Sequence, residues 1–310
     1  MPRATSAPFA GAAGKGRFIL ISAPAKINLY LGVHAGVDET GYHRVDSVMT
    51  TLDLTDTLAI APAERLMVRT VPEADFPQEE NSAYKAALAM GRAFGREPNF
   101  AILIDKHIPV RAGLGGPSTD AAATIMGICR YWGIDPRDER IDAVARSIGA
   151  DVPFFLYGPP AYLDGRGDAM REMFRPLTGT PVALVKPQQS GVSTVAGYKR
   201  FDEIGEEPAP LEPLLEALRA HDEEKIFARV SNNLGPVACE LCPEIGEILD
   251  WLRQQPDVRA ADVCGSGATV YAVCKTQMAA EKIGRAAMNE HGWWAQAARM
   301  EKSGPYIAVG

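Results

Sequence analysis

The stretch between Phe100 and Trp132 constrains the fold more than any other part of this chain. Its first residues, up to Lys106, have the alternation of a half-buried β-strand. A glycine-rich segment follows from Ile108 to Ala123 (IPVRAGLGGPSTDAAA), and apolar residues then recur at helical spacing as far as Trp132. The sequence therefore predicts a strand, a glycine loop and a helix in direct succession.

The glycine loop predicts an anion site. Glycines leave backbone N–H groups uncovered, and the positive end of the following helix points at the loop. Ser118, Thr119 or Asp120 can cap that helix. Phosphate is the favoured occupant, although a glycine turn before a helix can also be a simple tight connection. The loop is neither GxxxxGK[ST], since the lysine is missing, nor GxGxxG, since the glycine spacing differs.

Length and charge narrow the possible partners. The chain has 310 residues, of which 46% are hydrophobic and 23% charged, enough for two domains. Its net charge of −7 argues against nucleic acid or an anionic membrane as the main partner, because such surfaces attract clustered Lys and Arg. Residues 1–16 predict a disordered tail without the apolar core of a signal peptide, and no stretch approaches a membrane span. We therefore expect a cytoplasmic protein.

The five cysteines predict reduced, buried thiols, since their number is odd and most have apolar neighbours. Cys239 and Cys242 form a CxxC pair, which is typical of metal and redox sites. No second pair or nearby histidines complete a zinc shell, so packing is the favoured interpretation.

Two isolated charges stand in apolar surroundings. Lys26 lies in a β-like run over residues 17–33, which we expect to be strands broken at Ala23-Pro24, and Asn28 shares its strand face. Asp151 directly precedes Val-Pro-Phe-Phe-Leu. Each charge could reach water, Lys26 by snorkelling and Asp151 as a helix cap or turn residue. Alternatively they pair, which would keep Asp151 ionised and oriented to take a proton from a hydroxyl.

Two further segments carry weaker signals. Tyr42 and His43 follow a turn and offer an aromatic face and a hydrogen-bonding ring, which can stack on and read a base or be only a loop. Asn81 to Gly95 has helical spacing, with Asn81 or Ser82 as cap.

The chain loosens around residues 176–180, where we place a domain boundary. Beyond it, mixed strands and helices predict a sheet with helices on one face.

Six blocks in order resemble the GHMP kinases, a family of small-molecule kinases. The family's phosphate loop, Pro-x-x-x-Gly-Leu-Gly-x-x-Ser, matches Pro109 to Ser118, and Asp120 to Ala123 extend the match. The other five blocks are Pro24-Ala-Lys-Ile-Asn-Leu29, Gly41-Tyr-His43, Gly149-Ala-Asp-Val-Pro-Phe154, Gly191-Val-Ser-Thr194 and Gly265-Ser-Gly-Ala268.

The resemblance implies an α+β chain of two domains. Residues 17–180 would form an N-terminal, ATP-binding domain like ribosomal protein S5, and residues 181–310 a C-terminal ferredoxin-like domain, with the active site in the cleft between them. ATP would be the phosphoryl donor, with Mg²⁺ as counter-ion and Ser118 or Thr119 as candidate metal ligands. The resemblance is strongest to a branch of the family whose acceptor is a cytidylyl-linked polyol. We expect a monomer or weak homodimer.

The resemblance also assigns roles to residues. Asp151 would be the general base and Lys26 its electrostatic partner. The substrate contacts would be Asn28 on the polyol, His43 on the Watson–Crick edge of cytosine, Tyr42 and Tyr198 on the faces of that ring, and Thr194, Gly265, Ser266 and Gly267 closing the cleft. The ATP phosphates would contact Pro109, Val110, Arg111, Ala112, Gly113, Leu114, Gly115, Gly116, Pro117, Ser118 and Thr119, and the adenosine Asn81 and Lys106.

The chain departs from the family pattern at two places. Pro117 stands where a third glycine is usual, which removes one N–H group and predicts weaker ATP binding. Asn232-Asn-Leu-Gly235 stands where Asn-Asp-Leu-Glu is usual, which puts the hydrogen bonding there in question. Two other functions stay open: a GHMP kinase for a base-free alcohol such as homoserine or mevalonate, for which Tyr42-His43 would not be needed, and a silent nucleotide-binding protein, which the Lys26 and Asp151 pair argues against.

Overall fold

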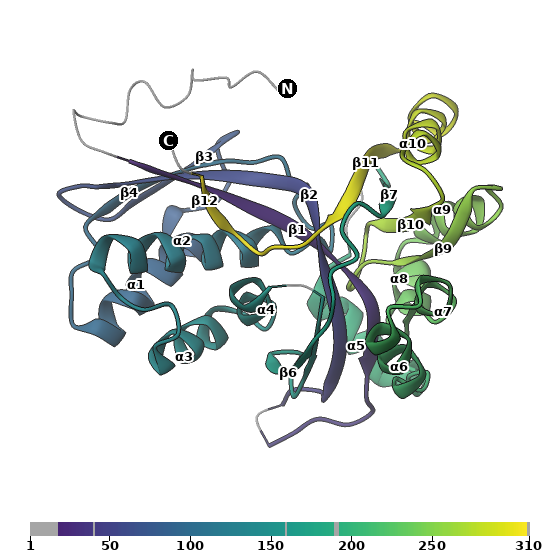
Figure 1. Cartoon of the computed structure of the whole chain (residues 1–310), viewed down its shortest axis with the longest axis horizontal. Helices are drawn as coiled ribbons and strands as arrows, with labels where there is room; N and C mark the ends of the chain where they lie inside the picture. Colours follow the sequence, from purple (N-terminus) through teal and green to yellow (C-terminus); the bar gives the residue numbers. More distant parts are fainter. Residues whose placement is uncertain (1–17, 40, 159, 189–191, 309–310) are drawn as a thin grey trace.

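The computed structural model describes residues 18–39, 41–158, 160–188 and 192–308, so the predicted tail over residues 1–16 lies outside the described residues. One mixed sheet runs through them, with the path β12-β1-β2-β11-β7-β10-β9 and side branches at β3 to β6 and β8. Helices α1 to α4 cover one side of the long N-terminal strands, and α5 to α10 gather around the other end (Figure 1).

Two long antiparallel strands form the axis of the sheet. They are β1 (Ile19–Val33) and β2 (Val45–Pro62). The expected break at Ala23-Pro24 is wrong, because β1 continues through it with a register shift between Pro24 and Lys26. An irregularity of this kind accommodates a residue without an N–H group inside a strand.

The N-terminal elements enclose one apolar core between sheet and helices. Asn81 caps α1 by accepting a hydrogen bond from the Ala83 N–H, as predicted. The remaining elements here are β3 (Met67–Val71), η1 (Gln78–Glu80), α1 (Ser82–Phe94), β4 (Phe100–Asp105), α2 (Gly116–Trp132), α3 (Glu139–Ile148), α4 (Val152–Tyr157), β5 (Ala161–Asp164) and β6 (Ala169–Met173).

The C-terminal elements pack around β10, which lies between β7 and β9. The partly buried Cys239 and Cys242 are free thiols against this core. The elements are β7 (Pro181–Lys186), α5 (Thr194–Ile204), α6 (Glu212–Ala220), α7 (Glu223–Phe227), β8 (Ser231–Asn232), α8 (Gly235–Leu241), α9 (Pro243–Arg253), β9 (Val258–Val263), β10 (Val270–Cys274), α10 (Gln277–His291), β11 (Trp294–Glu301) and β12 (Tyr306–Ala308).

The end of the chain returns to the strands of the N-terminal half. Strand β11 pairs with β7 along its length and then with β2 through Met300 and Leu52. Strand β12 pairs with β1. The two halves therefore share one sheet, and this long-range pairing left no signal in the local sequence pattern.

Candidate active site

The glycine loop between β4 and α2 fits tightly against two other parts of the chain. Gly113 and Gly115 have positive φ values of 74° and 75°. A Cβ atom at Gly113 would lie 2.1 Å from the carbonyl oxygen of Cys264, and one at Gly115 2.9 Å from Cγ of Lys26. Both the backbone conformation and the space therefore require glycine.

Helix α2 begins three residues earlier than a cap at Ser118 would allow. Gly115 is the N-cap, and its carbonyl accepts the N–H groups of Ser118 (3.0 Å) and Thr119 (2.9 Å), so the prediction of a Ser118, Thr119 or Asp120 cap is wrong. Pro117 sits in the first turn, where no intrahelical N–H is required. The glycines allow this early start because they can adopt the left-handed cap conformation.

The middle of the loop keeps backbone donors available. The N–H groups of Gly113, Leu114 and Gly115 donate no hydrogen bond to any residue that the structure describes. They lie beside the positive end of α2, an arrangement that binds anions. The Leu114 carbonyl accepts the Lys26 N–H at 2.9 Å, which fixes the loop to β1.

A buried ion cluster anchors the start of the loop. The Lys106 ammonium contacts the carboxylates of Asp56 on β2 and Asp120 on α2, the latter at 2.6 Å. The other Asp56 oxygen accepts the N–H groups of His107 (2.6 Å) and Ile108 (2.8 Å). Burial raises the pKa of Asp120, and the Asp56 carboxylate adds to this rise, whereas the Lys106 ammonium opposes it.

Lys26 and Asp151 come together across the chain. Their charged atoms lie 3.5 Å apart, with 4% and 33% of the side chains exposed, so the snorkelling alternative for Lys26 is wrong. Lys26 also donates to Asn28 Oδ1 at 2.6 Å, as expected for residues on one strand face, and Asn28 donates to Ser47 at 2.9 Å. Asp151 precedes α4 but makes no side-chain capping bond, so the prediction of a pair is confirmed.

The loop over residues 265–267 closes this side of the site. The Gly265 N–H donates to Asn28 Oδ1 at 3.1 Å, and Thr194 on α5 lies 3.1 Å from the Ser266 hydroxyl. Asn232 holds the loop from behind by donating to the carbonyls of Val263 and Gly265, each at 2.8 Å.

Asn233 explains the second departure from the family pattern. Its amide donates to the carbonyls of Val33 and Glu206, each at 2.8 Å, and accepts the Val33 N–H at 2.8 Å. An aspartate could accept that N–H group but could not supply the two donors. The hydrogen bonding at this position is therefore complete with asparagine.

A group of aromatic and polar residues forms the opposite end of the site. His43 is buried, with its Nδ1 atom 2.9 Å from the carbonyl of His34 and its Nε2 atom 3.0 Å from Asp202 on α5. Tyr198, also on α5, has its ring 5.5 Å from that of His43. Burial raises the pKa of Tyr198 to about 12, and the charge of Asp151 adds to this rise.

One pocket of about 830 Å³ brings these groups together from both halves of the chain. Lys26, Asn28, Asp151 and the aromatic group line it with most of the glycine loop. The predicted site residues in its lining are Lys26, Asn28, Tyr42, His43, Pro109, Arg111, Ala112, Gly113, Leu114, Gly115, Gly116, Pro117, Ser118, Asp151, Thr194, Tyr198, Gly265 and Ser266. Sequence reasoning missed Ser47 and Asp202, which line the same pocket.

Five predicted site residues lie outside this lining: Asn81, Lys106, Val110, Thr119 and Gly267. Thr119 is fully buried, and its hydroxyl has no partner among the described residues, so it does not reach the pocket as a metal ligand would. Ser118 does line the pocket, and a magnesium ion bound mainly through phosphates needs only one or two protein ligands.

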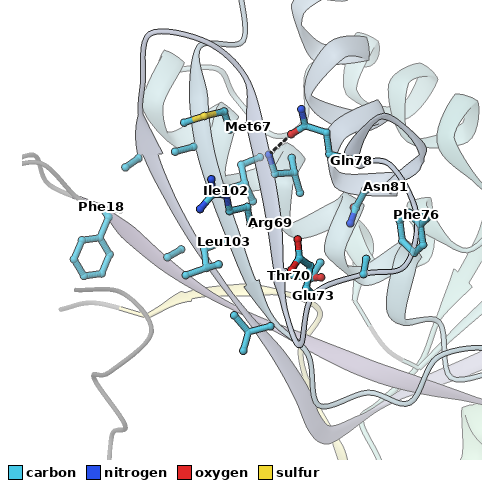
Figure 2. Close-up of a pocket in the computed structure, with 16 residues that line it drawn as sticks. Phe18, Met67, Arg69, Thr70, Glu73, Phe76, Gln78, Asn81, Ile102 and Leu103 are labelled. Carbon is cyan, nitrogen blue, oxygen red and sulfur yellow. Dashed lines mark hydrogen bonds between the residues drawn. The ribbon is translucent and has the colours of Figure 1, made fainter. Parts of the chain in front are cut away.

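A second pocket, of about 900 Å³, lies beside Asn81 (Figure 2). Figure 2 shows Asn81, Phe76, Glu73 and Thr70 around the same hollow. Lys106 borders it through its N–H group, which donates to the carbonyl of Val71 in the lining at 2.8 Å. Asn81 therefore lines this second pocket, whereas Lys106 lies between the two pockets. Its N–H group reaches Val71, and its ammonium lies beside Gly116 and Asp120 at the start of α2.

Comparisons with known proteins define the class. The family model described as GHMP kinases N terminal domain matches residues 81–159, and that described as GHMP kinases C terminal matches residues 214–292. The chain belongs to the GHMP kinase family, which implies a small-molecule kinase with ATP as phosphate donor. The predicted α+β fold of this family is confirmed. No helix in the described ranges is both long and apolar enough to cross a membrane.

Individual relatives have more specific names than the family. A 4-diphosphocytidyl-2-C-methyl-D-erythritol kinase from Bacillus pumilus is 35% identical over 270 residues, covering 86% of this chain and 91% of the relative. A crystal structure of 4-(cytidine 5'-diphospho)-2C-methyl-D-erythritol kinase matches with a TM-score of 0.72 and 30% identity, covering 92% of this chain and all (100%) of the other. A homoserine kinase from Cytophaga hutchinsonii has the same TM-score of 0.72 at 18% identity, covering 96% and 99%, and shows the fold alone.

Proposed function

We propose that this chain transfers the γ-phosphoryl group of ATP to the 2-hydroxyl of 4-diphosphocytidyl-2-C-methyl-D-erythritol, a step of non-mevalonate isoprenoid precursor biosynthesis. The observation that carries the proposal is the pair formed by Lys26 and Asp151, 3.5 Å apart, in one pocket with the glycine loop and with Tyr42 and His43. The names of the relatives at 30 to 35% identity support this choice of acceptor.

Asp151 acts as general base on the acceptor hydroxyl. As the hydroxyl oxygen attacks the γ-phosphorus, its proton passes to the Asp151 carboxylate and ADP leaves. The buried Lys26 ammonium, 3.5 Å from that carboxylate, fixes its direction and offers positive charge to the transferring phosphoryl group. Asn28, whose Oδ1 atom accepts from Lys26, contacts the polyol.

The glycine loop, residues 109–119, binds the ATP phosphates. Its free N–H groups at Gly113 to Gly115 and the positive end of α2 match the charge of a triphosphate. Mg²⁺, when bound, would neutralise charge on the phosphates, and Ser118, which lines the pocket, would be its protein ligand. The adenosine extends toward Asn81, which lines the pocket in Figure 2, and toward Lys106, whose N–H group donates to the carbonyl of Val71 in that lining.

The end of the pocket formed by Tyr42, His43 and Tyr198 holds the cytidylyl group. Tyr42 and Tyr198 supply faces for the ring and His43 an edge. Thr194 and the loop over residues 265–267 close the cleft between the regions over residues 17–180 and 181–310. We extend the proposal to a cytoplasmic location, because both substrates are water-soluble phosphate esters, and to a monomer or weak homodimer, because one chain supplies every group named here.

A coupled ADP-release assay tests this function. The wild-type protein is given ATP with the cytidylyl substrate, with homoserine or with mevalonate, at matched concentrations. We expect ADP release with the cytidylyl substrate alone, because the other two alcohols have no base for Tyr42 and His43. Faster turnover of homoserine or mevalonate would contradict the proposed acceptor while leaving the kinase class intact.

A further inference from the structure

His43 presents a single ring nitrogen toward the pocket. Its Nδ1 atom faces the His34 carbonyl at 2.9 Å and must donate to it, since a carbonyl oxygen only accepts. The ring is fixed by a tilted contact with Tyr198 and an edge contact with Phe201, with centroids 5.5 and 5.7 Å apart. Nε2 is therefore the ring nitrogen on the side of the pocket and of Asp202.

Asp202 stands directly beside that nitrogen. Its Oδ1 atom lies 3.0 Å from His43 Nε2, and 53% of its side chain is exposed. It follows Tyr198 by one turn of α5, so both side chains face the pocket, whose lining includes them. Among the described residues, His43 is the one basic group within ion-pair distance of Asp202, whereas the next residue, Glu203, pairs with Arg200.

The Asp202 carboxylate beside His43 limits which hydrogen-bonding groups a base can present there. An ionised carboxylate only accepts hydrogen bonds. Cytosine carries an exocyclic amino donor next to its ring nitrogen, at the position where uracil carries a carbonyl acceptor. A pyrimidine whose edge reaches His43 therefore brings either a donor or an acceptor up to the Asp202 carboxylate. An acceptor there would leave two facing oxygens without a proton between them, which is costly.

We propose that Asp202 selects cytosine over uracil by accepting a hydrogen bond from the exocyclic amino group of the base. The inference rests on the proposed function and names a specificity residue for it that lies outside the family motifs. His43 positions the edge of the base, and Asp202 reads the substituent that distinguishes the two pyrimidines.

The test compares the cytidylyl substrate with its uridylyl analogue, which has the same polyol diphosphate. The variants are Asp202→Asn, whose amide can donate to a carbonyl, and Glu203→Gln as a control with the same loss of charge on the same helix. We expect the wild type to prefer cytidylyl in kcat/KM by roughly 10-fold or more, as one charge-assisted hydrogen bond allows. Asp202→Asn should remove most of this preference through the KM of the acceptor, with the KM of ATP unchanged. Glu203→Gln should keep it.

Two results would overturn the inference. One is an unchanged cytidylyl-to-uridylyl ratio in Asp202→Asn. The other is a lower KM for the cytidylyl substrate in that variant, which would mean that the carboxylate blocks His43 rather than reads the base. Matching thermal melting curves for wild type and variant exclude misfolding as the cause.

Binding of CDP and UDP, measured by calorimetry, separates this inference from the proposed function. A wild-type preference for CDP that Asp202→Asn abolishes supports the inference even if the cytidylyl alcohol is not phosphorylated. Equal binding of CDP and UDP to the wild type overturns it whatever the turnover assay gives. Phosphorylation of another alcohol in place of the cytidylyl substrate contradicts the proposed function alone.

Discussion

The two ends of the main pocket are built differently. At the phosphate end, which comprises Lys26, Asp56 and the glycine loop, the side chains of Lys26 and Asp56 are almost completely buried and each is held by several partners, whereas Arg111 in the loop is exposed. At the base end, which comprises Tyr42, His43, Tyr198 and Asp202, two of the four side chains are more than half exposed. The contrast indicates that Lys26 and Asp56, at the proposed site of phosphoryl transfer, are held rigidly, whereas the residues that we propose to choose the acceptor lie at an accessible edge.

The difference has a physical reason. A buried ion pair must be completely satisfied, so it tolerates little change in its surroundings. A half-exposed residue is solvated when no ligand is bound, so it can be replaced at small cost to the fold. The same framework can therefore carry different acceptor specificities, in line with the equal TM-scores of 0.72 to the cytidylyl kinase and the homoserine kinase.

The largest effect is expected from Asp151→Asn. The amide has nearly the shape of the carboxylate but cannot take the hydroxyl proton, so turnover should fall by at least ~10²-fold while ATP binding persists. Steady-state kinetics and ATP titration measure the two quantities. Turnover at the wild-type rate would assign the base to another residue.

Asp56→Ala tests the rigidity of the phosphate end. It leaves the Lys106 ammonium with one carboxylate and the N–H groups of His107 and Ile108 without their acceptor. Breaking a buried pair in this way costs about 3–5 kcal/mol in the free energy of unfolding, measured by urea denaturation. The matched control is Glu281→Ala, which removes the exposed partner of Arg285 and should leave that free energy within error of the wild type. Equal losses of the free energy of unfolding in the two variants would contradict the tighter hold on the buried groups of the phosphate end.

His43→Ala tests the base end. It should raise the KM of the cytidylyl substrate by roughly 10-fold, as the loss of one or two hydrogen bonds predicts, with the KM of ATP almost unchanged. Kinetics with each substrate varied in turn give both values. A parallel rise in the two KM values would indicate structural damage and would make the two ends energetically inseparable.

The buried Asp262, which lies behind the loop over residues 265–267, should make the free energy of unfolding depend on pH. Burial raises its pKa to about 6, above the 3.8 of an exposed aspartate. The folded state therefore holds the proton more tightly, and the contribution of Asp262 to the free energy of unfolding is greatest below pH 4 and falls as the pH rises to about 6. Asp262→Asn should remove this part of the slope when unfolding is followed from pH 4 to 7. An unchanged slope would contradict the assignment to Asp262.

The smallest effect is expected from Pro117→Gly. The change restores one N–H group in the first turn of α2, so we expect the KM of ATP to fall only slightly, with a small loss of helix stability. Titration of ATP in the kinetic assay measures the change. An unchanged KM would mean that the proline costs nothing in phosphate binding.

The sequence predicted the pairing of Lys26 and Asp151 well because both charges interrupt apolar runs. Lys26 and Asp151 had few ways to be accommodated, and mutual pairing was one of them. Asp56 was not found in this way, because Thr55 and Thr57 flank it and Asp53 lies three residues earlier, so it does not interrupt an apolar run. Asp202 could not, because it lies in a polar stretch of α5 where a further carboxylate is unremarkable and only the fold brings it to His43.

The errors in the fold prediction came from contacts distant in sequence. Pro24 suggested a broken strand, but pairing with β2 on both sides of the irregularity keeps β1 continuous. The polar residues after the glycines suggested a side-chain cap, but packing against Lys26 and Cys264 holds the glycine backbone in a conformation that starts the helix at Gly116. The pairing of β12 with β1 links the two ends of the chain, which local patterns do not record.

The central claim is that the ion pair beside the glycine loop activates the hydroxyl of a cytidylyl-linked polyol. Phosphorus NMR of a reaction with ATP and 4-diphosphocytidyl-2-C-methyl-D-erythritol tests it most directly. The account predicts a new phosphomonoester signal on the polyol that grows in step with ADP and is absent with Asp151→Asn. ADP formed together with inorganic phosphate alone, or a phosphomonoester that forms equally fast in that variant, would contradict it.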